Sequence, residues 1–139
     1  MTQIPIYIIA MSTKPDIREL TKAEDQIMQI LWQLNTAFVK DIIEKLPSPK
    51  PAYNTVSTIV RILEKKGFVS FKAYGKTHEY FPIIAKDAYS NYYLKSFMNR
   101  YFKGSFQDLV SFFAKENKMN LTEMEAMIKR VESDLEKGD

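Results

Sequence analysis

Hydrophobic positions recur along this chain at two different spacings. Before residue 67, apolar side chains return every three or four positions, which predicts helices over residues 21–35, 39–46 and 52–66. The next segments, 68–74 and 78–83, are instead rich in aromatic and β-branched residues. Because they flank Gly75-Lys76-Thr77, a glycine-containing turn signal, they predict a β-hairpin.

Helical spacing returns after the hairpin. Segments 86–102 and 106–115, and a last stretch from Thr122, each carry large apolar side chains on one face. Three such faces within so short a segment cannot all be covered by one another. This part of the chain is therefore expected to associate with a second copy.

Residues typical of helix ends support these boundaries. Thr21 and Glu24 have the spacing of a capping box, and Thr122 with Glu125 repeats it. Pro47-Ser48-Pro49-Lys50-Pro51 cannot continue a helix, because proline lacks the amide N–H and restricts the residue before it. Residues 36–38 are too few for an independent strand but can pair with the hairpin.

The third predicted helix has an unusual polar face. Its apolar positions are Val56, Ile59, Val60 and Leu63, and the opposite face is expected to carry small hydrogen-bonding and cationic residues, namely Asn54, Ser57, Thr58, Arg61 and Lys65. Such side chains can reach base edges and phosphates in a major groove. The stretch from Pro51 to Pro82 is thus interpreted as a recognition helix followed by a wing.

Charge is concentrated in the same region. Residues 39–83 hold eight Lys or Arg against four Asp or Glu, whereas residues 84–139 hold nine of each. A polyanion would dock where this excess lies.

Composition argues against catalysis and metal binding. The chain has no Cys and a single His, His78, so it offers no thiol chemistry and no metal site, and no cofactor is expected. It also lacks a glycine-rich phosphate loop and a nucleophile paired with a base. We predict a non-enzyme, and the absence of Cys fits a reducing cytoplasm.

The predicted fold class is mainly α with a small β-hairpin wing: a winged helix-turn-helix DNA-binding domain followed by a helical dimerisation domain. Residues 20–84 form the first domain and 85–139 the second. Residues 1–19 are an N-terminal extension, whose apolar run over residues 4–11 is too short to span a bilayer and has no Lys or Arg before it. The first ten residues are either an upstream extension of the reading frame or an extra strand.

Three runs of sequence make the chain resemble the penicillinase-repressor family of the BlaI, MecI and CopY type. They are LTKAEDQIMQILWQL, AYNTVSTIVRILEKKGFV with the wing GKTHEYFP, and GSFQDLVSFFAKEN. The resemblance covers about residues 20–136. It implies a homodimeric repressor in which each winged helix reads one half of a near-palindromic DNA operator.

The resemblance also implies site residues. Base contacts map onto Asn54, Thr55, Ser57 and Thr58. DNA backbone contacts are expected from aromatic and cationic residues of the recognition helix and wing, namely Tyr53, Arg61, Lys65, Lys72, Lys76 and His78. The dimer interface is expected in the C-terminal helices, at Tyr93, Phe97, Tyr101, Phe112, Phe113, Met127, Ile128 and Val131.

Several members of the family are inactivated by cleavage when a membrane sensor of β-lactam antibiotics is triggered. Aligned on LVSFFAKEN, the corresponding bond is Phe112-Phe113. The resemblance thus implies a sensor-protease, or a protease that it triggers, as a further partner, and a role in antibiotic resistance. Phe112 stands where the best-known members have Asn.

A second interpretation stays open. The same fold can serve as a protein–protein adaptor without sequence-specific DNA binding, with the C-terminal helices as the docking surface. An adaptor would need apolar anchors on the outer face of the third helix. Steep loss of binding with added salt would favour DNA over this alternative.

Overall fold

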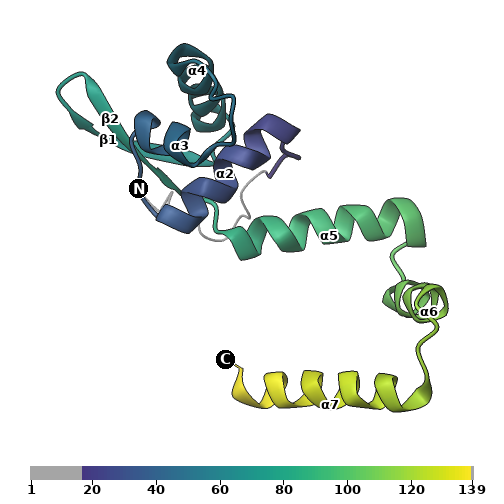
Figure 1. The fold of residues 1–139 in the computed structure, drawn as a ribbon. Coiled ribbons are helices and arrows are strands. Elements are labelled where there is room, and N and C mark those ends of the chain that lie inside the picture. The colour runs from purple at the N-terminus through teal and green to yellow at the C-terminus, as the bar shows by residue number, and fades with distance from the viewer. Residues whose placement is uncertain (1–16, 139) are drawn as a thin grey trace, which may run out of the picture. The chain divides into compact units, whose positions relative to one another are not determined.

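The computed structural model describes residues 17–138, so the apolar run over residues 4–11 lies outside the described part. Three helices and a hairpin come first: α2 (Lys22–Leu34), α3 (Val39–Lys45), α4 (Tyr53–Lys65), β1 (Val69–Tyr74) and β2 (Thr77–Pro82) (Figure 1). These are the elements predicted from the spacing of apolar residues. The mainly helical fold with a two-stranded wing is therefore confirmed.

Helix α2 begins where its capping box predicts. The Thr21 hydroxyl accepts a bond from the Glu24 N–H at 3.2 Å, and the Glu24 carboxylate accepts one from the Thr21 N–H at 2.9 Å. Two of the amide groups that a helix start leaves without partners are satisfied in this way. The helix ends at Asn35, whose N–H bonds to the carbonyl of Leu31.

The hairpin is antiparallel and runs from the pair Val69–Pro82 to the pair Tyr74–Thr77. Its turn therefore consists of Gly75 and Lys76 alone, and the prediction of a three-residue turn is wrong because Thr77 already pairs. Gly75 has a φ of 65°, a conformation that glycine adopts without steric cost. The predicted pairing of residues 36–38 is confirmed, since Ala37 exchanges both backbone bonds with Tyr80, at 2.9 and 2.8 Å.

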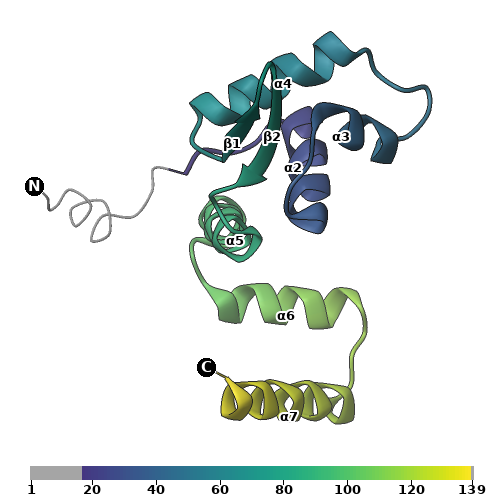
Figure 2. The same ribbon diagram turned by 90° about the vertical axis from the view of Figure 1, so that its left-hand side faces the viewer.

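One hydrophobic core joins these elements. Its largest fully buried side chains come from all three helices and from the start of the hairpin: Ile27, Met28, Leu31, Ile42, Val56, Val60, Leu63, Phe68 and Val69. Figure 2 shows the hairpin and α2 to α4 gathered in one unit. Burial of about nine such side chains, each stabilising by roughly 1.5–3 kcal/mol, gives this unit a core of its own.

The following helix, α5 (Lys86–Phe102), begins inside this unit. Ile84 and Tyr89 belong to its core, and the chain divides into two compact units between Tyr93 and Leu94. The division falls later than the boundary after residue 84 suggested by the sequence, because Tyr89 of α5 packs on Trp32 of α2 and on Phe68 just before the hairpin.

The second unit holds the rest of α5, then α6 (Phe106–Glu116) and α7 (Leu121–Lys137). Helix α7 starts one residue earlier than predicted. Its capping box is Asn120 with Glu123, each bond 2.9 Å long, and not Thr122 with Glu125. Asparagine is as good a cap as threonine, so the spacing alone did not identify the pair used. Among residues 94–138, Met98 is the only buried side chain.

Candidate nucleic-acid interface

Helix α4 presents most of the residues that the sequence singled out. It follows the proline-rich turn, and its first turn carries no acidic residue and no side-chain cap. The partial positive charge at its N-terminus is therefore not offset locally. Tyr53, Asn54, Thr55 and Thr58 are exposed along its first turns, and Tyr53 is 56% exposed.

Ser57 is the exception, and its predicted place on the outer face is wrong. Its side chain is only 8% exposed. Ser57 lies three residues before buried Val60, so it is about 60° away around the helix axis, at the margin of the buried face. A serine is small enough to be covered by its neighbours at this margin, whereas a longer side chain there would reach solvent.

Cationic residues continue the exposed face toward the wing. Arg61 and Lys65 are exposed on α4, and Lys72 and Lys76 are exposed on the hairpin. Glu79 pairs directly with Lys72 across the hairpin, so part of the wing's positive charge is offset.

The aromatic residues of the wing are ordered by stacking. The half-buried His78 ring lies parallel to the ring of Phe71, with centroids 4.0 Å apart. The Lys72 ammonium lies 5.4 Å from the centre of the Tyr74 ring. Burial raises the pKa of Tyr80, with Glu64 adding to the shift and Arg61 opposing it.

Two polar residues that sequence reasoning missed lie between the helices and the wing. Lys40, in the first turn of α3, and Thr77, at the start of β2, line a surface hollow of about 330 Å³ together with Tyr53 and the Phe38–Val39 segment. The pairing of residues 36–38 with the hairpin brings the start of α3 close to the start of β2. Because the sequence already predicted that pairing, Lys40 and Thr77 could have been found from it.

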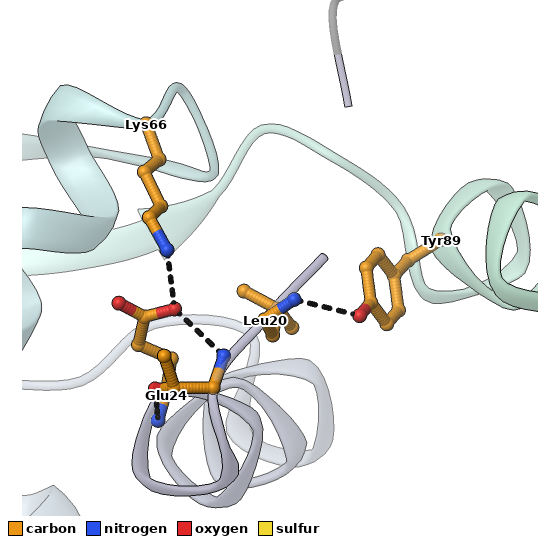
Figure 3. Close-up of polar contacts among 5 residues, drawn as sticks. Leu20, Glu24, Lys66 and Tyr89 are labelled. Atoms are coloured by element: carbon orange, nitrogen blue, oxygen red, sulfur yellow. Dashed lines mark hydrogen bonds and ion pairs between the residues drawn. The ribbon is translucent and has the colours of Figure 1, made fainter. Parts of the chain in front are cut away.

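Lys66, by contrast, is withdrawn from this surface. Its ammonium contacts the Glu24 carboxylate at 2.7 Å, and Glu24 is buried (Figure 3). Burial by itself would raise the pKa of Glu24, but the bonds from Lys66 and from the Thr21 N–H, with the positive charge of Lys66, together hold it below the usual value. The ion pair ties the end of α4 to the start of α2.

The residues expected at a dimer interface are mostly exposed. Seven of the eight are at least 43% exposed, namely Tyr93, Tyr101, Phe112, Phe113, Met127, Ile128 and Val131. Phe97 is half-buried, with its ring centroid 5.0 Å from that of Tyr101. The Phe112-Phe113 bond lies inside helix α6.

Two searches of the described residues found nothing. No group of three or more acidic or histidine side chains in residues 17–138 is arranged to hold a metal ion. None of the helices described there is long and apolar enough to cross a membrane.

The chain is similar to known regulatory proteins over most of its length. The family model described as penicillinase repressor matches residues 20–133. The methicillin resistance regulatory protein MecI of Mammaliicoccus sciuri is 30% identical over 114 residues, covering 78% of this chain and 89% of MecI. MecI of Staphylococcus aureus (strain N315) is 29% identical over 110 residues, with the same coverage.

Among solved structures, the chain is similar to the solution structure of the DNA binding domain of the repressor BlaI. The TM-score is 0.47 at 23% identity, over 55% of this chain and 94% of that one. The match of the family model extends over most of the sequence, from the start of α2 into α7. The chain therefore belongs to the penicillinase repressor family.

Proposed function

We propose that this protein is a transcriptional repressor that binds double-stranded DNA as a homodimer. The observation that carries the proposal is that α4 exposes small polar and cationic side chains and the wing exposes cationic and aromatic ones. The name of its relative MecI, a methicillin resistance regulatory protein, agrees with a regulatory role.

Base reading is assigned to Asn54, Thr55 and Thr58. All three are exposed on the first turns of α4, the part of a recognition helix that reaches base edges in the major groove. Ser57 is left out because it is covered.

Positioning on the phosphates is assigned to a second set of residues. They lie on α4 and the wing and are exposed, or in the case of His78 half-buried: Tyr53, Arg61, Lys65, Lys72, Lys76 and His78. Contacts to phosphates fix register and orientation without reading sequence. Lys40 and Thr77 extend this set, because they line the hollow beside Tyr53.

The homodimer is assigned to the C-terminal unit. Its helices expose large apolar side chains that a monomer leaves in water. Two copies joined there would place two reading units on one near-palindromic operator, with half-sites about one helical turn apart.

Relief of repression is assigned to cleavage of the Phe112-Phe113 bond after a β-lactam or another signal, through a sensor-protease or a protease that it triggers. The exposed side chains of both residues support this assignment. The helix around the bond must first open locally, because proteases bind extended chain. The protein acts as a repressor in the cytoplasm and catalyses no reaction.

One observation favours the adaptor alternative. Ile62, which is 40% exposed, lies among the polar residues of α4 and could anchor a protein partner. A single apolar side chain is a small anchor compared with the polar face around it, so we prefer DNA.

A selection of bound duplexes from a random DNA pool, followed by a salt titration on the selected site, tests the proposal. We expect a dyad-symmetric site and a log–log salt slope of roughly −0.9 for each phosphate neutralised. No enrichment over the starting pool, with protein binding that hardly responds to salt, would support the adaptor instead.

A further inference from the structure

A long-range hydrogen bond joins the start of α5 to the start of α2. The backbone N–H of Leu20, which is buried, donates to the hydroxyl of Tyr89 at 2.9 Å (Figure 3). The two residues are 69 positions apart in the chain. A buried N–H without a partner is costly, so this bond holds Tyr89 in one place relative to α2.

The segment before Tyr89 is fastened by two other bonds. The Trp32 indole N–H donates to the carbonyl of Ile84 at 2.9 Å, and the Ile83 N–H donates to the carbonyl of Phe68 at 2.8 Å. The Tyr89 ring also packs against Trp32 and Phe68, with centroids 6.1 and 5.7 Å apart. Tyr89 and the segment just before α5 are thus held at three points, to Trp32 of α2, to Leu20 just before α2 and to Phe68 just before β1.

We propose that Tyr89 is a positioning residue that fixes the direction in which α5 leaves the DNA-reading unit, and thereby sets the half-site spacing that the dimer accepts. The proposal rests on the function proposed above. It assigns to Tyr89 a role in operator choice although the residue is buried in the core and belongs to neither the recognition helix nor the wing.

The length of α5 makes its direction matter. Helix α5 is one continuous helix of 17 residues, and it carries Phe97 and Tyr101 beyond the anchored turns. From Tyr89 to Phe102 a helix extends about 20 Å. A tilt of about 10° at Tyr89 would move that end by about 3.4 Å, the rise of one base pair.

The hydroxyl can be removed with little else changed. Tyr89→Phe keeps the ring packed on Trp32 and Phe68 and deletes only the acceptor for the Leu20 N–H. Tyr92→Phe is the matched control, because Tyr92 lies one turn later and the described residues show no hydrogen bond from its hydroxyl.

The first measurement is the affinity of the full-length protein for operators whose half-sites are moved apart or together one base pair at a time. For Tyr89→Phe we expect about three- to tenfold weaker binding at the best spacing and a flatter profile, because the two half-sites are linked less stiffly. Affinity for a single half-site should not change, and Tyr92→Phe should match the unsubstituted protein. An unchanged spacing profile for Tyr89→Phe would overturn the proposal.

The second measurement needs no DNA. Amide hydrogen exchange of the full-length protein should be slow at Leu20 and in residues 86–93, and faster at these positions in Tyr89→Phe. If the unsubstituted protein selects no operator, the proposed function and the spacing role fail together, while slow exchange would still establish the anchor. If it selects an operator but exchange is equal in the two proteins, the anchor alone is refuted.

Discussion

The two units of this chain differ in how many of their apolar side chains are buried. Residues 17–93 bury seventeen hydrophobic side chains in one cluster. Residues 94–138 bury one, Met98, and leave aromatic and aliphatic side chains of α6 and α7 exposed. The helices α6 and α7 of the second unit are nevertheless capped and have apolar residues at helical spacing, like α2 of the first unit.

The difference shows that regular helices do not by themselves make a stable unit. In the first unit the hairpin closes over α2 and α4, so every helix has a partner. In the second, the described residues leave most of the apolar face of α6 and α7 exposed. Most helical stability comes from packing of an apolar face, and the first unit has such packing within itself. The exposed faces of the second unit agree with the proposed association with a second copy.

The largest effect that separates the units is expected from a matched pair of phenylalanine truncations. Phe68→Ala removes a fully buried ring and should lower the free energy of unfolding by about 3–5 kcal/mol. Phe112→Ala removes a ring of the second unit that is 54% exposed, so it should change the free energy of unfolding of the first unit by no more than about 0.5 kcal/mol. Urea unfolding followed by the fluorescence of Trp32, the single tryptophan, reports on the first unit. Equal losses would show one cooperative core.

The next largest effect is expected on self-association through the exposed apolar face of α7. Replacing exposed Ile128 and Val131 together by Glu should weaken self-association about a hundredfold, because two desolvated apolar anchors become charges. Ala126→Glu with Ser133→Glu is the control, since it adds the same charge on the opposite face of the same helix. Sedimentation across a concentration series measures both. Equal weakening by the two pairs would remove this face of α7 from the interface.

A smaller effect tests the ion pair of the first unit. The pKa of Glu24 is lowered in the folded protein, so its contribution is present above the ordinary carboxyl pKa and is lost as pH falls through the folded value. Glu24→Gln should lower the free energy of unfolding by about 1.5–3 kcal/mol at neutral pH. The difference between the variant and the unsubstituted protein should become smaller in acid.

Lys66→Gln removes the other half of the same pair. Like Glu24→Gln, it should make the free energy of unfolding depend less on pH than in the unsubstituted protein. A gap between Glu24→Gln and the unsubstituted protein that stays constant from neutral pH into acid would contradict the assignment. The measurement is again urea unfolding followed by Trp32 fluorescence.

Much of the first unit follows from local physics. Helical spacing, the Thr21–Glu24 capping box and the glycine turn each depend on neighbours in sequence, so they predict the elements correctly. Even the pairing of residues 36–38 with the hairpin could be foreseen, because a short extended segment between helices has few other partners.

Most of the errors come from packing that the spacing of residues does not describe. Ser57 lies at the edge of the buried face, and whether such a residue is covered depends on side chains distant in sequence. Tyr89 belongs to the core of the first unit because it contacts Leu20, Trp32 and Phe68. No pattern of residues within α5 predicts these contacts. The choice between two possible caps of α7 was equally undetermined.

The smallest effects should come from the recognition helix itself, and they test whether exposure decides which residues read bases. Asn54→Ala and Thr58→Ala should each cost about 1–2 kcal/mol of discrimination at particular base pairs, because each removes one polar contact from a groove. Ser57→Ala should leave discrimination unchanged, since its side chain is covered. Affinities for single-base variants of the selected operator, at one salt concentration, measure all three. If Ser57→Ala relaxed specificity as much as Asn54→Ala, then α4 would have to turn or shift on binding, and the free chain would not present the face that reads DNA.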